Sequence, residues 1–207
     1  MGSNQAESIA KFWRWFVDHR SDFDALLKSD EPFWDMALER LKKIDERLWF
    51  VMSEPDDGAR DFVVTAEGHI DVFPIAEALV SSAPEIVGWN FVALMPPRGF
   101  AFTTVYEGTF FDPQKMWFLP LDMTHRPQDL GLYIGIPGLE AMDKELAHNA
   151  ALVILDTGLG ERSAALDVNY TEVRELPDEP EAAGYIELPE LAEYIAWRKR
   201  KIVALVN

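Results

Sequence analysis

Residues 48–66 read LWFVMSEPDDGARDFVVTA, and this stretch decides the predicted fold. Its two apolar runs, residues 48–53 and 60–66, are rich in the aromatic and β-branched side chains typical of strands. The polar residues between them end in Asp57-Gly58, and glycine can adopt the positive φ that tight hairpin loops require. The stretch therefore predicts a β-hairpin.

The predicted hairpin leads into a helix and a further strand. Asp71 can cap a helix over residues 72–83, and Pro84 and Gly88 end that helix. The apolar residues 89–94 then have the length of a strand. The order of elements in this part of the chain is β-β-α-β.

A second β-β-α-β series is predicted further along. Its two strands, helix and final buried strand are at residues 116–121, 130–136, 139–148 and 150–155. Residues 48–51 (LWFV) align without a gap with residues 116–119 (MWFL), at an offset of 68 residues. This match indicates an internal duplication, with coincidence between two short aromatic runs as the alternative.

Helices are predicted on both sides of the two series. The first covers residues 6–28 and places apolar side chains on one face, namely Ile9, Phe12, Trp13, Phe16, Phe23 and Leu27. We interpret this aromatic face as core and expect Trp15 to be its most exposed neighbour. A second helix begins at Pro32 and buries Phe33, Ala37, Leu41, Ile44 and Leu48. A last helix covers residues 189–205.

Together these elements predict an α+β fold. Two N-terminal helices and a C-terminal helix pack on a mostly antiparallel mixed sheet, which is built from two β-β-α-β units. We expect residues 1–47 to form the helical pair, residues 48–110 the first unit, and residues 111–207 the second unit with an acidic loop and the last helix. All three parts are expected within one compact globule.

Composition excludes several classes of function. The chain has 36 acidic and 19 basic residues and a net charge of −17, which disfavours direct binding to nucleic acids or anionic membranes. It contains no cysteine, so disulfides, thiolate nucleophiles and cysteine-bound metals are excluded. Neither a secretory signal nor an apolar run of membrane-spanning length is recognised, and we expect a cytoplasmic location.

Six polar residues are candidates for a small-molecule or hydrolytic site at strand ends: Glu67, Asp122, His125, Asp156, Glu161 and Arg162. Residues 156–161 (DTGLGE) follow a predicted strand, and their glycines could let the backbone approach a phosphate. They lack the lysine of a P-loop and the third glycine of a dinucleotide site. The alternative is a strand-to-helix turn that Asp156 caps.

The other candidates also have two interpretations. His125 follows Asp122 by three residues and could act as a general base, or both could lie in a polar hairpin turn. Glu67 could face a ligand or cap the following helix. The four histidines have no metal-ligand spacing, so we predict neither a metal nor a cofactor.

Charge suggests a different function. Residues 172–193 contain eight acidic residues and one arginine, which predicts an acidic rim that attracts a basic protein partner. Solubility alone is the alternative. The basic residues 198–201 could bind nucleic acid, or they could complement the negative C-terminal end of a helix dipole. The negative net charge of the chain favours the helix-dipole interpretation. Trp117 and exposed aromatic residues of the first helix could also form a homo-oligomer interface between copies of the chain, because aromatic residues are enriched at protein interfaces.

Four segments carry a resemblance to a family of bacterial cytoplasmic α+β proteins without an established activity. They are residues 12–16 (FWRWF), 65–68 (TAEG), 83–91 (APEIVGWNF) and 155–161 (LDTGLGE). In composition and architecture the chain is also distantly similar to the ferredoxin-like protein inhibitors of ribonuclease E, an analogy that assigns no function. We expect a protein-binding or regulatory module, with an enzyme as the alternative.

Overall fold

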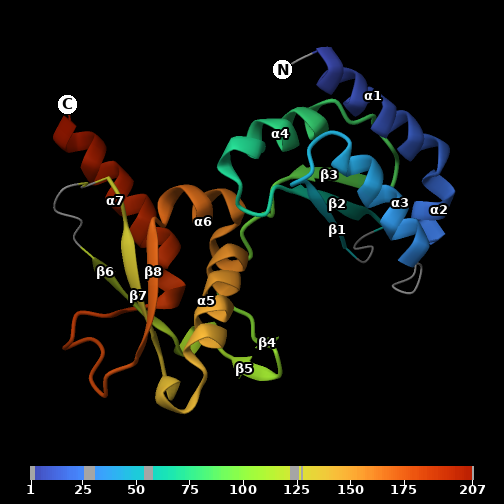
Figure 1. Ribbon diagram of the computed structural model, residues 1–207. Helices are drawn as coiled ribbons and strands as arrows, with labels where there is room; N and C mark the ends of the chain where they lie inside the picture. Colours follow the sequence, from blue (N-terminus) through green and yellow to red (C-terminus); the bar gives the residue numbers. More distant parts are fainter. Residues whose placement is uncertain (1–2, 26–30, 54–57, 122–125, 127, 207) are drawn as a thin grey trace. The chain divides into compact units, whose positions relative to one another are not determined.

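The computed structural model describes residues 3–25, 31–53, 58–121, 126 and 128–206 (Figure 1). The chain divides into two compact units, an N-terminal unit of Met1–Met95 and a C-terminal unit of Pro96–Asn207. The predicted α+β class is confirmed, with helices at the N-terminal and C-terminal ends of the described chain. The strands among these described residues belong to three sheets of three, two and four strands.

The N-terminal unit contains a three-stranded sheet in the order β1-β2-β3. Its elements are α1 (Ser3–Asp18), α2 (Arg20–Ala25), α3 (Glu31–Lys42), β1 (Trp49–Met52), β2 (Arg60–Thr65), η1 (Ile70–Val72), α4 (Phe73–Ser81) and β3 (Trp89–Ala93). Strand β2 is antiparallel to β1 and parallel to β3. The predicted β-β-α-β order is therefore confirmed here, although turn residues 54–57 lie outside the described part of the chain.

Aromatic rings form the core of the N-terminal unit. Phe16 is fully buried and stacks on Phe23, with ring centroids 4.0 Å apart. Its other neighbours include Phe62 of β2 and Trp89 of β3, both in edge-to-face contact. Edge-to-face pairs of this kind stabilise a core beyond the burial of their area. The predicted aromatic face is therefore core.

Two details of the predicted helices are wrong. Trp15 is only 7% exposed, because its ring packs against Phe33 and the Arg40 guanidinium lies 4.6 Å above it. The first helix is not continuous: α1 ends at Asp18, and α2 begins at Arg20. At the break, the imidazole Nδ1 of His19 lies 2.9 Å from the Trp15 carbonyl oxygen. A side chain that contacts this carbonyl competes with the regular backbone bonds of a helix.

The C-terminal unit contains a β4-β5 hairpin and a four-stranded sheet in the order β8-β7-β6-β9. Its elements are β4 (Thr104–Tyr106), β5 (Thr109–Phe111), η2 (Pro113–Lys115), β6 (Trp117–Leu121), β7 (Gly131–Ile136), η3 (Leu139–Ala141), α5 (Lys144–Leu159), α6 (Glu161–Asp167), β8 (Tyr170–Glu175), β9 (Ile186–Glu187), η4 (Leu188–Glu190) and α7 (Leu191–Val206). Strand β6 is antiparallel to β7 and β9, and β7 is parallel to β8.

The strand predicted at residues 150–155 is wrong, because these residues lie inside α5. A short apolar run does not distinguish a buried strand from a buried helix. Here the Asp143 carboxylate caps the helix by accepting a hydrogen bond from the Leu146 backbone N–H at 2.9 Å. The parallel partner of β7 is instead β8, reached through α5 and α6, since parallel strands need a long crossover.

The two units share one pattern of strand pairing. In each, an antiparallel pair is followed by a helical crossover and a parallel strand, which gives β1-β2-β3 and β6-β7-β8. Trp49 and Trp117 each begin the first of these strands. The matching topology is compatible with the proposed internal duplication, which stays a prediction.

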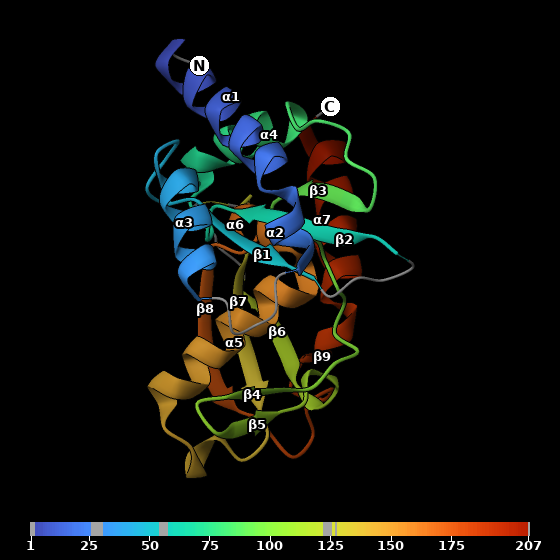
Figure 2. The same ribbon diagram turned by 90° about the vertical axis from the view of Figure 1, so that its right-hand side faces the viewer.

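The four-stranded sheet is covered on one face. Phe118, Leu132 and Ile134 point to that face, are fully buried and belong to one core with apolar residues of α5 and α7. Figure 2 shows α5 lying across these strands. Because side chains alternate along a strand, the opposite face carries a second set. These residues, here called the second face, are Trp117, Leu119, Leu121, Tyr133, Tyr170, Glu172 and Arg174.

Candidate functional site

The structure describes four of the six predicted site residues, namely Glu67, Asp156, Glu161 and Arg162. Glu67 lies in the N-terminal unit, after β2. Asp156, Glu161 and Arg162 lie in the C-terminal unit, where α5 passes into α6. The remaining two candidates, Asp122 and His125, lie outside the described residues, and their role stays a prediction.

Glu67 forms part of a tight turn. Its φ is 49°, and Gly68 follows with a φ of 80°, so both residues are in the left-handed region. The turn is closed by the His69 backbone N–H, which donates to the Ala66 carbonyl at 2.9 Å. The cap residue of the following η1 is His69, and it makes no side-chain capping bond. Glu67 is therefore an exposed turn residue, and its predicted role as a helix cap is wrong.

Asp156 and Glu161 lie close together. Asp156 is in the last turns of α5, and Glu161 begins α6 after a break at Gly160, whose φ is 77° and ψ is 151°. Glu161 is only 1% exposed. Burial of the Asp156 carboxyl, and then the nearby Glu161 charge, raises the pKa of Asp156. The predicted strand-to-helix turn with Asp156 as cap is wrong, yet the chain still brings two carboxyl groups together.

Residues 98–100 pack against the end of α5. The backbone N–H groups of Arg98 and Gly99 donate to the carbonyl oxygens of Thr157 and Gly158, at 3.0 and 3.1 Å. They satisfy carbonyls that have no partner within a helix end. The ring of Phe100 occupies the space where a Cβ of Gly158 would lie. Gly158 thus serves helix packing, and the geometry of a phosphate-binding strand-to-helix turn is not formed.

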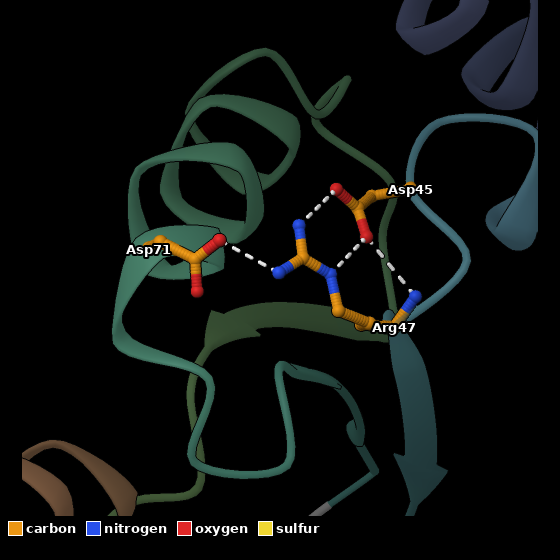
Figure 3. Close-up of polar contacts among 3 residues, drawn as sticks. All are labelled: Asp45, Arg47 and Asp71. Carbon is orange, nitrogen blue, oxygen red and sulfur yellow. Dashed lines mark hydrogen bonds and ion pairs between the residues drawn. The ribbon is translucent and has the colours of Figure 1, made fainter.

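A polar cluster in the N-terminal unit has no counterpart in the sequence analysis. The Arg47 guanidinium donates to both Asp45 carboxylate oxygens at 3.0 Å and to Asp71 at 2.6 Å (Figure 3). Hydrogen bonding to Arg47 lowers the pKa of both carboxyls. Arg47 binds both carboxylates and thereby links the segment before β1 to η1. We interpret the cluster as a structural link.

Seven of the eight acidic residues of segment 172–193 fall into two groups. The first group makes internal bonds: Glu172 accepts hydrogen bonds from the Tyr170 hydroxyl at 2.7 Å and from Arg174 Nε at 3.0 Å. Glu175 accepts hydrogen bonds from the backbone N–H groups of Gly138 and Glu140, at 2.7 and 2.8 Å. These two acids stabilise β8 and the turn at η3.

The second group surrounds the short strand β9. We call it the β9 acidic edge, and it consists of Glu179, Glu181, Glu187, Glu190 and Glu193, which are all exposed. Glu187 is paired with Trp117 across the sheet, and the adjacent Ile186 with Phe118. Of the five, Glu187 lies in β9 itself, and the other four line two hollows beside it.

Two open hollows adjoin β9. One has a volume of about 390 Å³ and is lined by Trp117, Glu179, Pro180, Glu181 and Ala182. The other has a volume of about 350 Å³ and is lined by Ile186, Glu190, Glu193, Tyr194, Trp197 and Arg200. Each hollow therefore combines at least one aromatic side chain with two carboxylates of the β9 acidic edge.

The segment that carries Glu179 and Glu181 is held against the sheet. The backbone N–H of Tyr185 donates to the Pro180 carbonyl at 2.9 Å, and Tyr185 is 9% exposed. Its ring and Leu176 lie over Gly135 of β7, where an added Cβ would meet them at 3.0 and 2.6 Å. Sequence analysis predicted a surface loop here, and the structure shows that this loop packs on the second face.

The basic residues near the C-terminal end of the chain are used within the C-terminal unit. Arg198 donates to the carbonyl oxygens of Gln128 and Asp129, at 2.9 and 2.7 Å. Lys199 forms an ion pair with Asp167 at 2.7 Å, and the Lys201 ammonium lies 4.8 Å from the centroid of the Trp197 ring. These contacts, two of them to other segments and one within α7, account for much of the basic cluster without a polyanionic partner.

Among the residues that the structure describes, no group of three or more His, Cys, Asp or Glu side chains could hold a metal ion. In the same part of the chain, no helix is both long and apolar enough to span a membrane. Comparison with known proteins finds no matching family model, no significantly similar curated protein and no significantly similar solved structure. The family resemblance given above therefore stays a prediction.

Proposed function

We propose that the protein is a binding or regulatory module that recognises a basic protein through the β9 acidic edge. The observation that carries this proposal is the placement of five exposed carboxylates around β9, beside two hollows with aromatic linings. Aromatic side chains are enriched at protein interfaces, where they supply apolar contact area.

The charge of the chain supports the same partner. A net charge of −17 attracts cationic proteins over long distances and repels polyanions. The carboxylates of the β9 acidic edge are exposed, so electrostatic attraction accelerates association more than it raises affinity. We therefore expect binding that weakens as salt screens the charges.

The test uses the full chain and fluorescently labelled hexalysine as a basic probe. Fluorescence anisotropy should show binding that weakens between about 20 and about 300 mM salt. One variant replaces the β9 acidic edge by glutamine, at Glu179, Glu181, Glu187, Glu190 and Glu193. A control variant with the same charge change replaces the exposed residues Glu67, Glu85, Glu107, Glu140 and Glu145.

We expect the edge variant to lose most of the affinity for hexalysine and the control variant to retain it. Equal losses in the two variants would show that only the net charge matters. That result would overturn the proposal and would support the alternative, in which the negative charge only maintains solubility.

An acid–base site in an enzyme is a second candidate function, supported by the raised pKa of Asp156 beside the buried Glu161. Two carboxyl groups in such a pair can hold different protonation states and act as acid and base. A hydrolytic activity lost in both Asp156→Asn and Glu161→Gln, with the fold retained by circular dichroism, would support this candidate. Activity unaffected by either change would exclude this site.

A further inference from the structure

We propose that the hollow at Trp117 holds a lysine or arginine side chain of the basic partner. This inference rests on the proposed function and names the group that the site would recognise. It starts from the lining of the hollow, in which Trp117, Pro180 and Ala182 supply apolar surface and Glu179 and Glu181 supply negative charge.

A long cationic side chain fits this combination of surfaces. Its methylene stem can contact apolar surface while its charged end stays hydrated. A cation over an indole ring is attracted by the electrons of the ring face, most strongly for tryptophan. Carboxylates beside the ring accept charge-assisted hydrogen bonds from the same cation. The hollow thus offers each of the three contacts that a lysine or arginine makes.

The neighbouring strands already hold a cation in this way. The Arg174 guanidinium lies 3.2 Å from the centroid of the Tyr133 ring, and its Nε donates to Glu172 at 3.0 Å. Tyr133 and Glu172 are paired across β7 and β8, on the same second face as Trp117. An aromatic ring with an adjacent carboxylate therefore binds a basic side chain within this sheet.

The second hollow is less suited to a cation. Arg200 is part of its lining and opposes a further positive charge there. In the Trp117 hollow the described lining consists of one aromatic, two acidic and two apolar residues. We therefore place the basic side chain at Trp117.

The indole N–H signal of Trp117 in a ¹⁵N-labelled full chain gives a local measurement. The chain has seven tryptophans, and Trp117→Phe identifies the signal that belongs to this residue. Addition of hexalysine or hexaarginine should shift this signal along a saturating curve with the Kd found by anisotropy. Hexaglutamate serves as the negative control.

Two pairs of variants measure the contribution to affinity. Trp117→Val removes the ring while keeping a strand-forming residue, and Trp49→Val at the start of β1 is its matched control. We expect Trp117→Val to weaken hexalysine binding by about two- to fivefold, the effect of one exposed cation–π contact. Glu179→Gln with Glu181→Gln should weaken it by roughly two- to tenfold, and Glu107→Gln with Glu145→Gln by less.

The outcomes separate the two proposals. If hexalysine binds and requires the β9 acidic edge, but the Trp117 signal does not move and Trp117→Val binds as the wild type does, the inference about the hollow is wrong. The proposed function would then stand. If hexalysine does not bind even at low salt, the proposed function itself is wrong.

Discussion

The ring of Phe100 lies directly against Gly158 of α5. Three of its carbon atoms are within 2.2 to 2.6 Å of the position that a Cβ of residue 158 would take. The adjacent Gly99 donates its backbone N–H to the Gly158 carbonyl at 3.1 Å. The first segment of the C-terminal unit is therefore packed against a helix position where a side chain does not fit.

Gly158→Ala should destabilise the protein by about 1–3 kcal/mol, because overpacking forces a buried ring to move. Alanine favours a helix over glycine by about 1 kcal/mol, so this effect opposes the clash. Urea unfolding measures the balance, with exposed Glu145→Ala in the same helix as the control. A more stable Gly158→Ala variant would contradict the described packing.

Trp13→Phe should lower the free energy of unfolding by about 1–2 kcal/mol. The Trp13 indole N–H donates to the Leu79 carbonyl at 2.8 Å and ties α1 to α4. That carbonyl also accepts a hydrogen bond from the Ser82 hydroxyl at 2.9 Å, so the change does not leave it without a donor. Thermal or urea unfolding followed by circular dichroism checks the expectation. A loss well above this range would mean that Trp13 contributes mainly through packing.

Arg47→Met should reduce stability at neutral pH, and the difference from wild type should disappear in acid. Hydrogen bonding to Arg47 lowers the pKa of Asp45 and of Asp71 in the folded protein. The stabilisation is therefore present above the ordinary carboxyl pKa of about 4 and is lost as pH falls through the lowered values. Unfolding free energies measured across pH 2 to pH 7 give the curve. A pH-independent difference would show that the Arg47 stem, and not its charge, stabilises the unit.

Asp156→Asn should have the opposite dependence on pH. Burial and the Glu161 charge raise the pKa of Asp156, so the folded protein binds a proton more tightly than the unfolded chain does. Wild-type stability from this group is then present below the ordinary carboxyl pKa of about 4 and is lost as pH rises through the raised pKa of Asp156. We expect Asp156→Asn to be more stable than wild type at pH 7 and equal to it at pH 2. A variant that is less stable at pH 7 would overturn this assignment.

Gly135→Ala should weaken hexalysine binding without unfolding the protein. A Cβ at residue 135 would meet the side chains of Leu176 at 2.6 Å and Tyr185 at 3.0 Å, so these two side chains, which flank the segment that carries Glu179 and Glu181, must move. We expect a fall in affinity of about two- to fivefold, similar to the loss of one exposed contact. Gly138→Ala is a control for general destabilisation, because the positive φ of 75° strains an alanine there while the added Cβ meets no atom within 4 Å. Unchanged binding by Gly135→Ala would show that the position of this segment does not matter.

Several features follow from local sequence. The aromatic residues at helical spacing predict the core of the N-terminal unit, where Phe12, Phe16 and Phe23 are all buried. The runs around Trp49 and Trp117 predict strands, and both residues begin one. These predictions agree with the structure because a helix or strand with apolar residues on one side has a single favourable orientation toward a core. Trp49 is nevertheless 40% exposed, because side chains alternate along a strand and its neighbour Phe50 is the buried one, at 3% exposure.

The candidate site was less accessible to sequence analysis. The acidic character of residues 172–193 is visible in the sequence, and it predicts a charged surface. The hollow at Trp117 is not visible in the sequence, because it depends on a loop that packs on Gly135. That packing joins residues that are distant in sequence. The proximity of Asp156 and Glu161 follows from the helix break at Gly160, where sequence analysis predicted a strand-to-helix turn.

The sequence alone determined the α+β class, the net charge and the aromatic core, because composition and periodicity express which residues avoid water. Tertiary structure decided that residues 150–155 are helical, since a fully apolar segment is buried equally well as a helix or a strand and its neighbours select between them. It also decided which carboxylates lie around β9. Pairing between strands sets that arrangement, and no local pattern in the chain encodes it.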